Sequence, residues 1–122
     1  MMSRRICSVG PDAPVIEAAR AMQEAKVGAL LVAENARFIG IVSEADLVRS
    51  VLAVGGDARQ VRVADVMKAP IITIEIDRSA HEASDLMAER GIRHLAVTDA
   101  GKIVGMLSVR DLLRYFKNWG TL

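Results

Sequence analysis

The sequence has few aromatic residues, one cysteine, little net charge and no long apolar segment. Its 122 residues include one Trp, one Tyr, two Phe and a single cysteine, Cys7, so no intrachain disulfide is possible. A chain without disulfides fits a reducing compartment, and no apolar run reaches the roughly 18 residues that a membrane-spanning helix needs. The net charge is +1 and no signal-peptide pattern is present, so we expect a soluble cytoplasmic protein without membrane association.

An internal repeat is the main feature that the sequence does have. Residues 2–50 align without a gap on residues 67–115, a shift of 65 positions. The clearest match sets the stretch from Gly40 to Leu47 against the stretch from Gly105 to Leu112. A unit of about fifty residues rarely buries enough surface to be stable alone. We therefore expect the two copies to pack by pseudo-twofold symmetry into one module with two related clefts between them.

Each copy is predicted to run strand, helix, strand, strand, helix. In the first copy we expect strands over residues 6–9, 29–33 and 38–42, and helices that begin near Pro14 and at Ser43. The mostly apolar segment 38–42 is expected to be buried on both faces. The predicted repeats span residues 1–54 and 63–122, joined by a polar linker over residues 55–62 that begins with Gly55-Gly56.

These features resemble a tandem pair of the cystathionine-β-synthase (CBS) domain family. The resemblance runs from about residue 2 to about residue 117. Its residues are Val63–Met67 followed by Ile71–Ile74, Glu82-Ala83 with Met87, Arg93–Val97, and a Gly-x-x-Ser-x-x-Asp-Leu stretch that closes each copy. It implies a mixed α/β (α+β) fold of two β-α-β-β-α repeats. The turn at Val63–Met67 has no counterpart before Ile6, so either the protein is naturally short there or upstream sequence is absent.

The resemblance implies an adenosine-containing ligand: AMP, ADP, ATP or S-adenosylmethionine. Ser43 and Ser108 precede predicted helices, where free backbone N–H groups favour an anion. Asp46 and Asp111, one turn later, could accept hydrogen bonds from both ribose hydroxyls. Ser-x-x-Asp is also close to a capping box, which is the simpler interpretation of the spacing alone. The two roles are compatible, because a hydroxyl both donates and accepts.

The two predicted clefts differ in charge. Besides the serine and aspartate pairs, the candidate ligand residues are two apolar and three basic side chains: Ile71, Leu107, Arg93, His94 and Arg110. We expect adenine to lie against Ile71 or Leu107, and we expect the phosphates to bind near the basic side chains. The first copy has Gly28 and Ala29 where the second copy has Arg93 and His94. The Asp46 cleft is therefore expected to prefer a phosphorylated ligand; the alternative is that these basic residues form a solvated strand end.

The sequence predicts a binding module rather than an enzyme. No serine or cysteine has a predicted base and orienting acid, no phosphate-binding glycine loop is present, and no metal-ligand spacing occurs, so we expect no required cofactor and no metal. Oligonucleotide binding is disfavoured by the scarce aromatics. A homodimer is expected through apolar faces of the second helices, formed by Leu47, Val48, Val51, Leu52, Leu112, Leu113 and Phe116. The alternative function is a structural dimerisation or docking domain for an unidentified effector protein.

Overall fold

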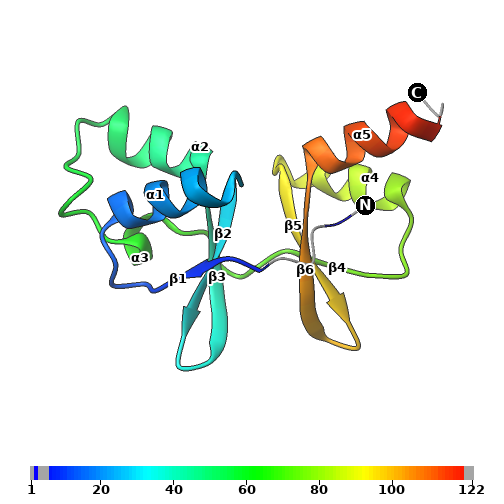
Figure 1. The fold of residues 1–122 in the computed structure, drawn as a ribbon, viewed down its shortest axis with the longest axis horizontal. Coiled ribbons are helices and arrows are strands. Elements are labelled where there is room, and N and C mark those ends of the chain that lie inside the picture. The colour runs from blue at the N-terminus through cyan, green and yellow to red at the C-terminus, as the bar shows by residue number, and fades with distance from the viewer. Residues whose placement is uncertain (1, 3–5, 120–122) are drawn as a thin grey trace. The chain divides into compact units, whose positions relative to one another are not determined.

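The computed structural model describes residue 2 and residues 6–119, and the chain divides into two compact units. The N-terminal unit comprises Cys7–Ile71, and the C-terminal unit comprises Ile72–Leu122 together with Met1–Ile6. Each unit has a three-stranded sheet, with strand order β1-β2-β3 in one and β4-β5-β6 in the other. Helices pack against each sheet (Figure 1). The mixed α/β fold with a repeated topology is confirmed.

The N-terminal unit contains the expected elements and one short helix more. Its elements are β1 (Ser8–Val9), α1 (Val15–Ala25), β2 (Ala29–Glu34), β3 (Arg37–Ser43), α2 (Glu44–Leu47), the π-helical turn η1 (Val48–Leu52) and α3 (Val63–Val66). Strand β1 pairs parallel to β2, and β2 pairs antiparallel to β3. Helix α1 begins after Pro14 and ends where Lys26 adopts a left-handed conformation.

The C-terminal unit repeats this order. Its elements are β4 (Thr73–Glu75), α4 (Ala80–Arg90), β5 (His94–Asp99), β6 (Lys102–Ser108) and α5 (Val109–Trp119). The pairing follows the 65-residue shift: Leu31 N–H donates to the Cys7 carbonyl at 3.1 Å, and Ala96 N–H donates to the Ile72 carbonyl at 3.2 Å. Helix α4 starts at a capping box, in which the Ser79 hydroxyl accepts from Glu82 N–H.

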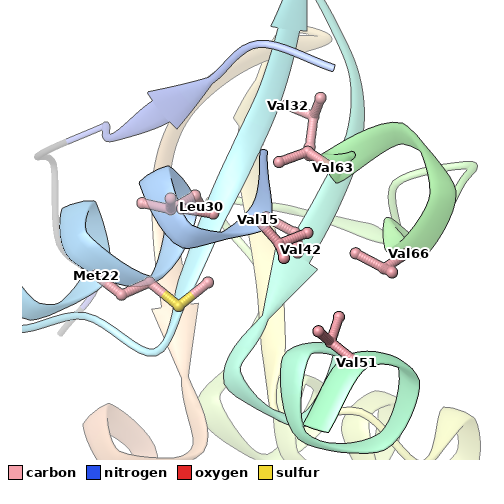
Figure 2. Packing of buried hydrophobic residues seen from close by; sticks show 9 residues of the cluster. Val15, Met22, Leu30, Val32, Val42, Val51, Val63 and Val66 are labelled. Atoms are coloured by element: carbon pink, nitrogen blue, oxygen red, sulfur yellow. The ribbon is translucent and has the colours of Figure 1, made fainter. Parts of the chain in front are cut away.

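The core of the N-terminal unit draws on α1, β2, β3, η1 and α3 (Figure 2). Its fully buried side chains include Val15, Leu30 and Val42. Helix α3 adds Val63, which is 0% exposed, and Val66. The compact units therefore differ from the sequence repeats. Residues 63–71, which open the second copy, pack with the first copy, and Met2, which opens the first copy, packs on the core of the second.

Burial along β3 differs from the expectation from sequence. The segment 38–42 was expected to be buried on both faces, but only Gly40 and Val42 are buried, and Phe38 is 39% exposed. The prediction was wrong because β3 lies at the edge of a three-stranded sheet, and side chains on one strand alternate between its two faces. Strand β2, at the centre, is the one buried over four consecutive residues, Ala29 to Val32.

The second helices bury only part of their apolar residues within their own units. Val51 in η1, and Leu112 and Phe116 in α5, belong to the hydrophobic cores. Leu52 and Leu113 remain 68% and 56% exposed. The apolar side chains available to a partner are thus fewer than the sequence indicated. None of the helices within the described ranges has the length and apolar character needed to cross a membrane.

Candidate ligand site

The junction of β3 and α2 holds the first Ser-x-x-Asp pair in a capping box. Ser43 is extended, and its N–H donates to Asp46 Oδ2 at 2.9 Å. The Ser43 hydroxyl lies 3.0 Å from the same oxygen and accepts from Asp46 N–H at 3.3 Å. The simpler interpretation of this motif, a helix cap, is therefore correct for the chain alone. The cap also fixes the orientation of the Asp46 carboxylate, which a ligand site would require.

The Asp46 carboxylate is nearly buried and faces the ammonium group of Lys68. The residue is 7% exposed, although charged side chains are rarely buried without a partner. One oxygen, Oδ2, accepts the capping bonds, while the other, Oδ1, lies 3.8 Å from the ammonium nitrogen of Lys68. The Lys68 side chain is 70% exposed, so its ammonium stays accessible from solvent. The pair thus places an acceptor oxygen and an accessible cation side by side.

The backbone holds Lys68 beside β3. Ile41 N–H donates to the Lys68 carbonyl at 3.0 Å, and Lys68 N–H donates to the Ile41 carbonyl at 2.8 Å. Gly40 permits this approach, because a Cβ there would lie 2.8 Å from Met67 Sδ and 2.9 Å from the Lys68 carbonyl oxygen. The sequence suggested only backbone groups of residues 68–71 as contacts for adenine, so the Lys68 side chain was not among the predicted ligand residues. Its only signal was its position directly after the Val63–Met67 motif, because nothing in the spacing links it to Asp46.

The C-terminal unit repeats the cap at the junction of β6 and α5. Ser108 N–H donates to Asp111 Oδ2 at 2.8 Å, and the Ser108 hydroxyl accepts from Asp111 N–H at 3.1 Å. Asp111 is half-buried, whereas Asp46 is buried. By the repeat, the counterpart of Lys68 is Ser3, an uncharged residue that lies outside the described residues. The two aspartates therefore share a backbone setting but differ in burial, and the repeat places no basic residue at the Lys68 position of the second site.

The other predicted site residues occupy varied positions. Within the C-terminal unit, His94 begins β5 and pairs in register with Ser108, so the two residues are brought together. Arg93 and Arg110 are exposed. Leu107 is 3% exposed and belongs to the hydrophobic core, which leaves little of its side chain for a ligand. Ile71, half-buried, is the last residue of the N-terminal unit.

The charge asymmetry between the clefts stays a prediction. Asp46 belongs to the N-terminal unit, and Arg93, His94 and Arg110 belong to the C-terminal unit. Their convergence on one ligand is therefore an inference from the repeat and the resemblance. Within the described part of the chain, no group of three or more His, Cys, Asp or Glu side chains could hold a metal ion.

Sequence comparison decides the family of this chain. A profile described as CBS domain matches residues 1–53 and again residues 63–118. The chain belongs to the CBS domain family. The CBS domain-containing protein YhcV of Bacillus subtilis is 32% identical over 111 residues, which cover 91% of this chain and 79% of that protein. The profile matches follow the bounds of the sequence repeats. In the compact units, by contrast, residues 63–71 group with the first copy and Met1–Ile6 group with the second.

Two further comparisons show the extent of the similarity. A structure with CBS domains from Burkholderia ambifaria MC40-6 superposes with a TM-score of 0.88 and 36% identity, covering 92% of this chain and 82% of that one. An uncharacterized protein of Methanopyrus kandleri is 34% identical over 113 residues, or 91% of this chain. The chain spans 58% of the length of that Methanopyrus relative.

Proposed function

We propose that this CBS pair is a regulatory module that senses an adenosine-containing ligand: AMP, ADP, ATP or S-adenosylmethionine. CBS domain pairs are generally regulatory ligand-binding modules, and the chain belongs to that family. A CBS domain pair solved in complex with 5′-methylthioadenosine and S-adenosyl-L-methionine shares the fold, with a TM-score of 0.85 at 19% identity. That likeness supports the fold; the adenosine part of the ligand is what the family resemblance implies, and the residues of this chain support a sugar and a phosphate.

The arrangement of Asp46 and Lys68 carries the proposal. A ribose offers two neighbouring hydroxyl donors, and Asp46 Oδ1 is the acceptor that the helix cap leaves available. Lys68, 3.8 Å from that oxygen, supplies a positive charge for a phosphate attached to the sugar. A carboxylate alone would repel a phosphate, so the cation makes a nucleotide a better fit than a nucleoside.

Calorimetric titration with AMP, ATP, adenosine and S-adenosylmethionine tests this proposal. Asp46→Asn keeps the side-chain size but removes the charge, and we expect it to weaken nucleotide binding at least about tenfold, equivalent to about 1.4 kcal/mol. Asp111→Asn, the matched change in the other copy, is expected to spare phosphate-dependent binding. Equal losses in both variants would refute the asymmetry, and unchanged binding in both would refute the site.

The Lys68→Gln variant tests whether Lys68 binds the phosphate of the ligand rather than its sugar. We expect this variant to lose affinity for ATP and AMP while its affinity for adenosine changes little, because the Lys68 side chain is 70% exposed and its ammonium interacts mainly with charge. The ATP loss should shrink as salt rises, since screening reduces the wild-type advantage. Equal losses for ATP and adenosine would show that Lys68 does not meet the phosphate.

A second candidate is a dimerisation or docking domain that uses no nucleotide. It is favoured by exposed apolar side chains next to the second helices: Val48, Leu52, Val54, Val109, Leu113 and Tyr115. Thermal shift distinguishes the two functions, because a ligand at a hundredfold excess over its Kd adds about 2.7 kcal/mol of stability. A panel of adenine compounds that leaves Tm unchanged would favour this second function.

A further inference from the structure

The linker between the two copies is bonded to the start of α1. The Val61 carbonyl accepts from Val15 N–H at 2.9 Å. The Ala58 carbonyl accepts from Ile16 N–H at 3.0 Å. These are the first two N–H groups of α1, which follow the N-cap residue Pro14 and have no partner within the helix itself. The linker therefore caps α1, whereas the matching helix α4 begins with a side-chain capping box.

Three consecutive carbonyl groups of the loop before α1 hold the segment that follows the linker. The carbonyls of Pro11 and Ala13 accept from the first two N–H groups of α3, both at 2.9 Å. Between them, the Asp12 carbonyl accepts from the Arg62 guanidinium, also at 2.9 Å. Arg62 immediately precedes α3, so its side chain adds a third bond at the same anchor. A substitution can remove this third bond without changing the backbone.

Helix α3 connects this anchor to the candidate site. It is a single turn, Val63–Val66, and a helix this short has little stability of its own. Its two valine side chains are buried in the core (Figure 2). Met67 is extended, and the next residue, Lys68, forms two backbone hydrogen bonds with Ile41 of β3. The place at which Lys68 meets β3 therefore depends on how the start of α3 is held.

The hydrogen bond, rather than the ion pair, is the stronger contact of Arg62. Its guanidinium lies 4.0 Å from Asp12 Oδ1, and the two side chains are 59% and 86% exposed. Exposed ion pairs contribute little to stability. The bond from the guanidinium to the Asp12 carbonyl, at 2.9 Å, has the usual length of an N–H···O hydrogen bond. It ties the side chain to backbone that leads directly into α1.

We propose that Arg62 is a positioning residue for Lys68 of the candidate nucleotide site. The bond to the Asp12 carbonyl fixes the start of α3, and α3 fixes where Lys68 joins β3. The Lys68 ammonium then lies 3.8 Å from Asp46 Oδ1. The linker thus sets the separation between the cation and the carboxylate. This inference rests on the proposed function, because the position of Lys68 affects binding only if a phosphate meets its ammonium.

A double-mutant cycle tests the positioning role. Arg62→Ala should weaken ATP binding about two- to fivefold, the effect of losing one exposed hydrogen bond, and should change adenosine binding little. In the Lys68→Gln background the same substitution should cause no further loss of ATP affinity, because the ammonium through which it acts is gone. Equal losses in both backgrounds would overturn the proposal, since they would show a direct or a general structural effect.

Asp12→Asn separates the hydrogen bond from the ion pair. This variant removes the Asp12 charge but keeps the backbone carbonyl that accepts from Arg62. We expect its ATP affinity to equal that of the wild type. A loss as large as that of Arg62→Ala would assign the effect to the ion pair and overturn the role of the hydrogen bond.

Amide hydrogen exchange of the ligand-free chain tests the positioning role apart from the proposed function. In Arg62→Ala the amides of Lys68 and Ile41 should exchange about two- to fivefold faster, because the anchor of α3 is weakened. The Leu31 amide, bonded to the Cys7 carbonyl, is the control and should keep its rate. An unchanged Lys68 amide, or equal acceleration at Leu31, would overturn the proposal. A wild-type chain that shows the expected exchange but binds no nucleotide would refute the proposed function alone.

Discussion

Gly40→Ala is the substitution that most directly probes how the fold supports the candidate site. The added Cβ would lie 2.9 Å from the Lys68 carbonyl oxygen, whereas comfortable contacts begin at about 3.5 Å. The Met67 side chain, 2.8 Å away, can rotate, but the Lys68 carbonyl is backbone that is bonded to Ile41. The substitution must therefore push the Met67–Lys68 backbone away from β3.

The expected loss of stability has two contributions. Overfilling a packed position costs about 1–3 kcal/mol. Weakening the two hydrogen bonds between Ile41 and Lys68, which measure 2.8 and 3.0 Å, adds about 1 kcal/mol. We expect a loss of about 2–4 kcal/mol in the free energy of unfolding. At about 4 °C per kcal/mol for a chain of this size, Tm falls by roughly 8–16 °C.

Calorimetry and ligand titration together test the reasoning. Gly10→Ala is the control, because a Cβ at Gly10 meets nothing within 4 Å. It should leave Tm unchanged or slightly raised, since alanine reduces the entropy of the unfolded chain. Gly40→Ala should also weaken phosphate-dependent nucleotide binding, because Lys68 moves with its backbone. Equal Tm values for the two variants would refute the close-approach argument.

Further predictions concern the turn and the second helix. Ala36→Gly should stabilise the protein by up to about 1 kcal/mol, because Ala36 has a φ of 62° that glycine adopts without strain. The counterpart substitution Gly101→Ala, at a φ of 82°, should destabilise the protein by a similar amount. Urea unfolding measures both changes. Leu112→Ala should cost about 2–5 kcal/mol because the residue is 2% exposed. Leu113→Ser should leave stability unchanged but reduce any dimer mass in light scattering; an unaltered dimer would exclude that face.

The repeat made most of the fold predictable. Periodicity and the capping box identified the strands and helices, and the identical pair Gly40/Gly105 fixed the alignment. Segment 38–42 was misjudged because an apolar composition does not distinguish an edge strand from a central one. The role of α3 was also missed. Its motif was assigned to the second copy by sequence order, while packing joins it to the first.

The caps at the candidate site were predictable from the sequence. Ser43, Asp46, Ser108 and Asp111 form them because local spacing determines a helix cap, while their role as ligand residues, which the resemblance implies, stays a prediction. The Lys68 side chain was missed, because its approach to Asp46 depends on a bridge between residues far apart in sequence. Long-range pairing of this kind leaves no periodic signal within either segment.

The exchange of leading segments has a consequence for how the two copies depend on each other. The core of the N-terminal unit includes Val63 and Val66 from the start of the second copy, and Met2 from the start of the first copy packs against the other core. A chain with a single copy would therefore complete its core only with the leading segment of a second molecule. Joining both copies in one chain raises the effective concentration of each segment at the core on which it packs.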